Sequence, residues 1–125
     1  DSTYARLFPI LARAITREYG LPRVPWAWVT WAAVQLALGR RLSRFDPLAA
    51  ARDARQPLLL IHGTEDQTVP VEESTMLFEA WRGPKEQWLE PGIGHVLLST
   101  MNLPIYCTRL AAFFDRWLSA STSTR

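Results

Sequence analysis

The fold is decided by residues 58–70, which read LLLIHGTEDQTVP. The first four residues of this stretch are all apolar, as in parallel strands that are buried on both faces, so we predict a strand over Pro57–His62. The proline at the other end favours the start of a helix, which we expect over Pro70–Trp81. Asp66 therefore lies in the loop that leaves the carboxyl end of a buried strand, where the active sites of open α/β sheets are found.

The chain beyond this stretch continues the alternation of strand and helix. We predict a second strand over Glu86–Leu89, a loop over Glu90–His95 and a final helix over Pro104–Leu118. The order strand, helix, strand, helix is typical of a parallel sheet with crossover helices, so the expected fold class is α/β. Two parallel strands need paired neighbours and covered faces to be stable. We therefore expect further strands from residues outside this sequence or from another chain.

Two side chains with catalytic chemistry are expected at one edge of this sheet. Asp66 follows the first strand, and His95 follows the second strand after the glycine-rich loop PGIG. A carboxylate beside a histidine fixes the imidazole tautomer and stabilises the imidazolium, which leaves the other ring nitrogen to act as a base. The alternatives are structural: Asp66 as the cap of a turn before Pro70, and His95 bonded to a backbone carbonyl. The two identifications depend on each other.

These residues carry a resemblance to the α/β-hydrolase family. The pattern His-Gly-x-x-Asp-x-x-Val-Pro over residues 62–70 resembles the acid loop of the family, and the Gly-His pair before the last helix resembles its histidine loop. The resemblance covers residues 57–118 and implies the family order of nucleophile, acid and histidine. It also implies that Asp66, and not Glu65, is the triad acid and that His95 is the triad histidine.

The segment 1–56 resembles the helical cap that α/β-hydrolases insert between strands of the core sheet. We expect a first helix over Tyr4–Tyr19, a second and very apolar helix over Pro25–Leu42, and a short third helix. The first two residues of the chain resemble the exit from the preceding core strand. After this cap-like segment, we expect the C-terminal part of the core over 57–119 and a flexible tail over 120–125.

One part of the family pattern is absent from the sequence. None of the 6 glycines belongs to a Gly-x-Ser-x-Gly elbow, so the nucleophile and the oxyanion donors are expected outside the chain. We therefore expect a piece of a larger hydrolase that is inactive alone. Ser99 lacks the strained strand-to-helix turn of such a nucleophile, and Cys107 is expected to be a small buried residue. His62 is predicted to make a structural hydrogen bond at the strand end.

The composition limits the classes of partner. The chain is 48% hydrophobic and 21% charged, as globular proteins are, and its net charge of +2 gives no reason to expect nucleic acid. The only cysteine allows no internal disulfide and favours a reducing, cytoplasmic location. No spacing of His and Cys fits a metal site, and we expect neither a metal nor a cofactor. The apolar run of the second helix ends at Gly39, too early to span a membrane, and we favour a cap or core helix over one that lies on a membrane surface.

Two functions from different classes are consistent with the sequence. The favoured one is a fragment of a serine hydrolase that supplies the triad Asp and His for acyl hydrolysis of the esterase, lipase or peptidase kind. The 6 tryptophans, half of them in the second helix, favour a small apolar acyl or aromatic substrate in the intact parent. The alternative is a non-catalytic interaction module that uses the sheet edge and the Trp-rich helix. Because the first strand is apolar on both faces, we expect the isolated chain to self-associate.

Overall fold

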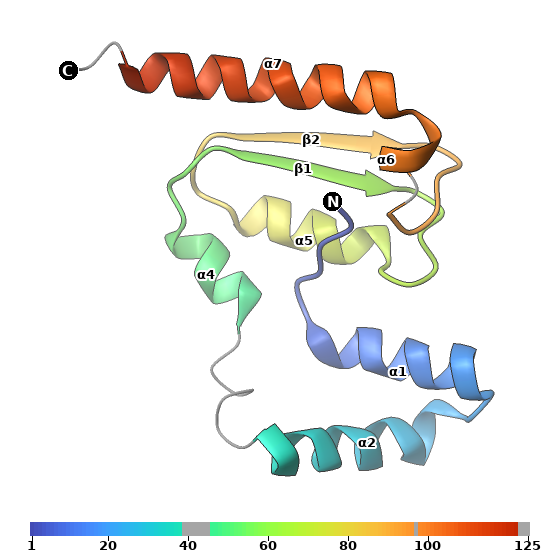
Figure 1. Ribbon diagram of the computed structural model, residues 1–125. Helices are drawn as coiled ribbons and strands as arrows, with labels where there is room; N and C mark the ends of the chain where they lie inside the picture. The colour runs from blue at the N-terminus through green and yellow to red at the C-terminus, as the bar shows by residue number, and fades with distance from the viewer. Residues whose placement is uncertain (39–45, 97, 123–125) are drawn as a thin grey trace.

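The computed structural model describes residues 1–38, 46–96 and 98–122, without the side chains of 99 and 120–122 (Figure 1). In chain order the elements are α1 (Leu7–Tyr19), α2 (Arg23–Leu38), α4 (Pro47–Asp53), β1 (Leu58–Gly63), α5 (Val71–Ala80), β2 (Lys85–Glu90), α6 (Leu98–Met101) and α7 (Leu103–Thr122). The strands β1 and β2 are parallel, and their register runs from Leu58 opposite Lys85 to Gly63 opposite Glu90. Helix α5 makes the crossover between them, so the fold class is α/β, as the sequence predicts.

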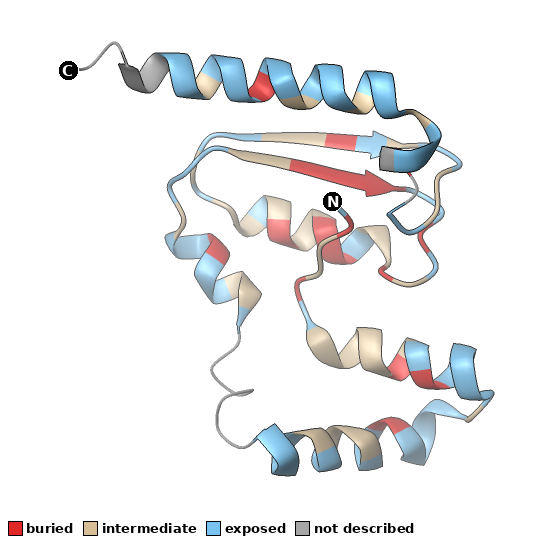
Figure 2. Ribbon diagram, in the orientation of Figure 1, coloured by how far each residue is buried: buried red, intermediate tan, exposed pale blue. Residues whose placement is uncertain are grey.

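Helices cover both faces of the two-stranded sheet. Helix α7 lies along one face, and α5 and α4 lie on the other (Figure 1). Successive side chains of a strand point to opposite faces, so Leu60 and Ile61 of β1 enter different clusters. Leu60 packs with Ala5, Ala51 and Leu77, whereas Ile61 packs with Trp88 and Leu98. The apolar run of β1 shows no alternation because each face has its own core, and Figure 2 shows the second half of the strand buried.

Helices α1 and α2 form an antiparallel pair that stands apart from the sheet (Figure 1). The pair is here called the cap hairpin, after the cap-like segment that we expect from the sequence. The buried residues between them are Ala12, Ile15 and Ala27. The ring of Phe8 in α1 contacts that of Trp28 in α2, with centroids 4.8 Å apart. Gly20 ends α1 at φ 65°, a left-handed conformation that glycine adopts without steric cost. The hairpin therefore has a small core of its own.

Expected and observed elements differ mainly at their ends. Helix α1 begins at Leu7, and Val24 near the start of α2 is not helical, because a residue that precedes proline avoids the helical region. Helix α7 continues to Thr122, so the expected tail 120–125 overlaps its last turn. The last three residues of that tail, and the expected end of the second helix at Leu42, lie outside the described residues. The short helix α6 was not predicted.

Not all of the segment 1–56 belongs to the cap hairpin. Helix α4 packs against α5, and its Ala51 is only 1% exposed in the core cluster of Leu60. At the other end of the segment, the N–H of Ser2 donates to the carbonyl of Ile61, 3.0 Å away, so the first residues run beside β1. Within the described ranges, no helix combines the length and the apolar character needed to cross a bilayer.

Candidate active site

Asp66 lies in the loop between β1 and α5, and the loop itself fixes its carboxylate. The side chain has no exposed surface. Its Oδ1 accepts hydrogen bonds from the backbone N–H groups of Thr68 at 2.9 Å and Val69 at 2.8 Å. An aspartate that accepts from the backbone two and three residues ahead closes a turn with its own side chain. The second oxygen, Oδ2, is left for partners from other elements.

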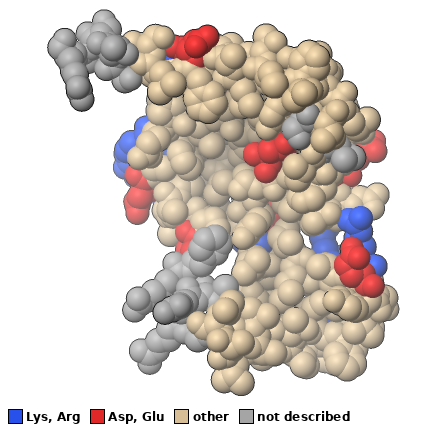
Figure 3. Space-filling model, in the orientation of Figure 1, with Lys and Arg blue, Asp and Glu red and all other residues tan. Residues whose placement is uncertain are grey.

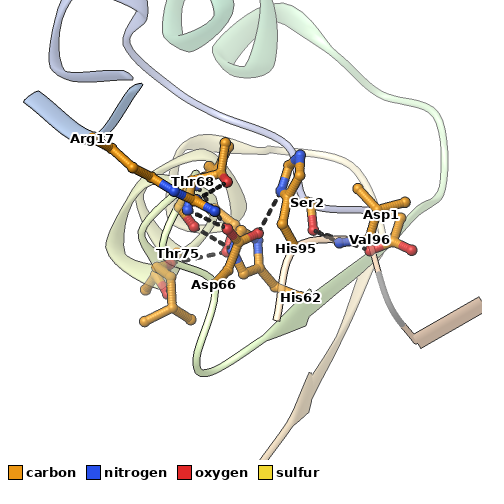
Figure 4. Close-up of polar contacts among 12 residues, drawn as sticks. Asp1, Ser2, Arg17, His62, Asp66, Thr68, Thr75, His95 and Val96 are labelled. Atoms are coloured by element: carbon orange, nitrogen blue, oxygen red, sulfur yellow. Dashed lines mark hydrogen bonds and ion pairs between the residues drawn. The ribbon is translucent and has the colours of Figure 1, made fainter. Parts of the chain in front are cut away.

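His95 lies in the loop after β2, and its ring contacts Oδ2 of Asp66. Its Nδ1 lies 2.8 Å from Asp66 Oδ2, and the histidine side chain is 39% exposed (Figure 4). Because the ionised carboxylate only accepts, Nδ1 carries the proton and Nε2 keeps a free lone pair in the neutral ring. In the described part of the chain, Nε2 has no hydrogen-bond partner. His95 therefore has a ring nitrogen, Nε2, that is free to act as a base.

Backbone contacts tie the acid loop and the histidine loop together. The N–H of Glu65 donates to the carbonyl of Ile93 at 3.0 Å, and the N–H of Thr64 donates to that of Glu90 at 2.9 Å. Gly63 sits so close that an added Cβ would lie 2.1 Å from the carbonyl oxygen of Ile93. Only glycine permits this approach. The two loops therefore hold Asp66 and His95 in register, although 29 residues separate them.

The contacts of Asp66 determine whether its carboxyl group is ionised. Burial alone raises the pKa of Asp66, but the hydrogen bond from Val69 and the hydrogen bond and positive charge of His95 outweigh it. A further hydrogen bond from the side chain of Ser2 also lowers the pKa of Asp66, which ends below its usual value. The group is therefore ionised at neutral pH. An ionised carboxylate is what stabilises an imidazolium.

His62 lies beneath Asp66 at the end of β1 and is fully buried. Its Nε2 is 2.8 Å from the carbonyl oxygen of Val69 and 3.4 Å from Asp66 Oδ2. A carbonyl only accepts, so Nε2 carries a proton that faces both oxygens. Nδ1 has no partner in the described structure. The structural role expected from the sequence is thus combined with a contact to the acid.

The other residues singled out from the sequence are not part of this site. Glu65, the neighbour of Asp66, is exposed. Cys107 is exposed on α7, so the expectation of a small buried residue was wrong, because the helix turns that position away from the sheet. The side chain of Ser99 lies outside the described residues. Among the described residues, no group of three His, Cys, Asp or Glu side chains is placed to hold a metal ion.

Two residues near the acid were missed by sequence reasoning. Ser2 is 7% exposed, and its hydroxyl oxygen accepts the N–H of Val96 at 3.3 Å, next to His95. Arg17 of α1 reaches across to the acid loop, where it donates to Thr68 Oγ1 at 2.9 Å (Figure 4). No local pattern marks these residues, because their partners are 94 and 51 residues away in the sequence.

Known proteins resemble this chain over most of its length. Residues 23–121 match the prolyl oligopeptidase family (Peptidase_S9). The uncharacterized protein YqkD of Bacillus subtilis (strain 168) is 30% identical over 115 residues, which are 92% of this chain and 38% of YqkD. Two structures of the Pyrococcus furiosus esterase Pf2001, in space groups P212121 and C2221, superpose with TM-scores of 0.69 and 0.68.

The structural match covers 94% of this chain but only 43% and 42% of the esterase, at 25% and 24% sequence identity. The chain therefore spans less than half the length of each of these relatives. The family match extends from the start of α2 into the last turn of α7 and so includes both candidate catalytic residues. The chain belongs to the prolyl oligopeptidase family and has part of an α/β-hydrolase fold.

Proposed function

We propose that this chain supplies the acid and the histidine of a serine hydrolase, with Asp66 and His95 in these roles. The reaction is transfer of an acyl group from an ester or amide to water. The nucleophilic serine and the oxyanion donors come from residues outside the 125 of this sequence. Membership of a hydrolase family supports the reaction class, and the esterase likeness supports an ester as the first substrate to test.

In the proposed mechanism, Asp66 accepts the proton of His95 Nδ1 and so keeps Nε2 free to take the proton of the serine. The resulting imidazolium is stabilised by the buried carboxylate, and Nε2 then donates the same proton to the leaving group. The observation that carries the proposal is the 2.8 Å contact between His95 Nδ1 and Asp66 Oδ2, since Oδ1 is already held by two backbone N–H groups.

A second function has one observation in its favour. The helix α2 exposes large apolar side chains, among them Trp28 at 61% and Leu36 at 87%. Exposed apolar surface of this kind marks binding sites for other proteins or covers that are supplied by the rest of a fold. A non-catalytic interaction module, which binds a partner through this helix and the sheet edge, is therefore the alternative to the hydrolase.

The test uses the protein expressed from its complete natural reading frame. A fluorophosphonate probe, which modifies only activated serines, is expected to label one serine outside this segment, and hydrolysis of an aryl ester is expected to require the same serine. His95→Ala is expected to abolish both signals, whereas Glu65→Gln, in the loop that also carries Asp66, is expected to keep them. A complete protein that neither reacts with the probe nor hydrolyses esters would support the interaction module instead.

A further inference from the structure

A cavity of about 530 Å³ lies between the cap hairpin and the start of α5. A second hollow of about 360 Å³ adjoins it, because Arg13 and Arg23 line both. Volumes in this range are typical of sites for small organic ligands. Figure 3 shows basic side chains, with acidic ones beside them, at the junction of core and hairpin, where the surface is hollowed. The cavity therefore combines a ligand-sized volume with positive charge.

The larger cavity has an apolar wall that belongs to the hairpin. Its apolar members are Phe8, Pro9, Ala12, Val24, Ala27 and Trp28. The rings of Phe8 and Trp28 are packed 4.8 Å apart at an interplanar angle of 45°, so the wall is formed by an aromatic pair in contact. Such a wall favours an aromatic or aliphatic body over a polar one.

The basic residues of the cavity differ in how they are neutralised. Arg6 is paired with the buried carboxylate of Glu73, to which its Nε donates at 3.0 Å. Arg13 and Arg23 have no hydrogen bond and no ion pair in the described structure. Because Glu73 is already paired with Arg6, Glu72 is the remaining acidic residue in the lining that offsets the charges of Arg13 and Arg23. The cavity thus holds one net positive charge on guanidinium groups, which bind oxyanions through two parallel hydrogen bonds.

We infer that this cavity binds an organic monocarboxylate with an aromatic or aliphatic body. The body contacts the Phe8–Trp28 wall, and the carboxylate pairs with Arg13 and Arg23. The carboxylate of Glu72, which lines the same cavity as the two arginines, disfavours a phosphate dianion. This inference adds a charge requirement to the apolar or aromatic substrate expected from the sequence.

The position of the cavity connects it to the proposed catalytic pair. Arg17, which lines the second hollow, donates to Thr68 Oγ1, and the N–H of Thr68 donates to Asp66 Oδ1. The basic end of the cavity thus adjoins the loop that holds the triad acid. As a statement about substrates, the inference rests on the proposed function: the substrate carries a carboxylate apart from the bond that is cleaved. As a statement about binding, it stands without the reaction.

The experiment measures binding to the protein from the complete reading frame by isothermal titration calorimetry. The probes are 4-phenylbutyrate, its neutral analogue 4-phenylbutanamide, and inorganic phosphate. We expect the carboxylate to bind at least about tenfold more tightly than the amide, because only the acid pairs with the guanidinium groups. Inorganic phosphate is expected not to displace it. Equal binding of acid and amide, no binding of either, or displacement by phosphate would overturn the inference.

Variants locate the site and separate it from catalysis. The double variant Arg13→Gln/Arg23→Gln is expected to lose the preference for the acid, whereas Arg82→Gln, beyond the far end of α5, is expected to keep it. His95→Ala is expected to bind 4-phenylbutyrate as tightly as the parent protein. An acid preference that survives in the double variant would contradict the assignment. If the parent protein itself bound 4-phenylbutyrate but hydrolysed no ester, the proposed function would be refuted while this site would stay in place.

Discussion

The sheet edge and the cap hairpin are built by different rules. At the sheet edge, two backbone N–H groups hold Asp66, and the loop that carries Asp66 donates backbone hydrogen bonds to Glu90 and Ile93 at 2.9 and 3.0 Å. The hairpin has its own small core and contacts the rest of the molecule mainly through two arginine side chains: that of Arg6, the residue before α1, with Glu73, and that of Arg17 with Thr68. Geometry is therefore fixed where chemistry is proposed, and contacts are made by adjustable side chains where a ligand is proposed.

The largest expected effect comes from a substitution at the sheet edge, where the geometry is fixed. In the complete protein, Asp66→Asn is expected to lower kcat by at least about a hundredfold, because an amide NH2 turned toward His95 favours the wrong imidazole tautomer. The same change in the triad of a serine protease lowers kcat by about four orders of magnitude, so a hundredfold is a cautious expectation. The measurement is kcat on one aryl ester, with melting temperatures compared to the parent protein.

Glu65→Gln provides the matched control for that change. Glu65 is the neighbouring carboxylate on the same loop, and it is exposed, whereas the side chain of Asp66 is buried. We expect the kcat of Glu65→Gln to stay within about twofold of the parent, since solvent and salt screen the charge of an exposed carboxylate from the catalytic pair. If Glu65→Gln were inactive and Asp66→Asn nearly normal, the acid would be assigned one residue too late.

The same contrast explains what the sequence could predict. Both strands, the crossover helix, Asp66 and His95 follow from local signals: an apolar run, a proline, and loops off the carboxyl ends of neighbouring strands. Arg6 could not be assigned to Glu73 in this way, because 67 residues separate them and nothing local records the contact. The exposure of Cys107 was missed for a related reason: a helical pattern gives a face but not the amount of cover over it.

The next largest expected effect is a loss of stability, caused by a substitution next to the cap hairpin. Arg6→Ala removes the guanidinium from a Glu73 carboxylate that is 2% exposed and leaves it the backbone N–H of residue 6, 2.9 Å away. Leaving a buried acceptor without its partner costs about 1–3 kcal/mol, and the half-exposed position of the arginine favours the lower part of that range. We expect a lower free energy of unfolding in urea, with the same dependence on denaturant as in the parent.

Arg116→Ala is the control for this prediction, since Arg116 pairs with Glu86 at a site where both side chains are exposed, at 60% and 39%. A surface pair of this kind contributes about 0–1 kcal/mol. Equal losses in the two variants would show that burial of Glu73 adds nothing to its pair, and the hairpin would then be held mainly by apolar contacts.

The smallest expected effect is a change in the contribution of Asp66 to stability at acid pH. Although burial alone raises the pKa of this carboxyl, the hydrogen bonds from Val69 and His95 and the charge of His95 bring it below the usual value. A carboxyl whose folded pKa is depressed adds stability above its unfolded pKa of about 3.9, and loses that contribution as pH falls through the folded value. The difference in unfolding free energy between the parent and Asp66→Asn should therefore shrink below about pH 4. Urea unfolding at a series of pH values measures it, and Glu65→Gln should show no comparable slope. A difference that grew below about pH 4 would mean that the folded protein holds Asp66 protonated, and an acid in that state could not stabilise the imidazolium of His95.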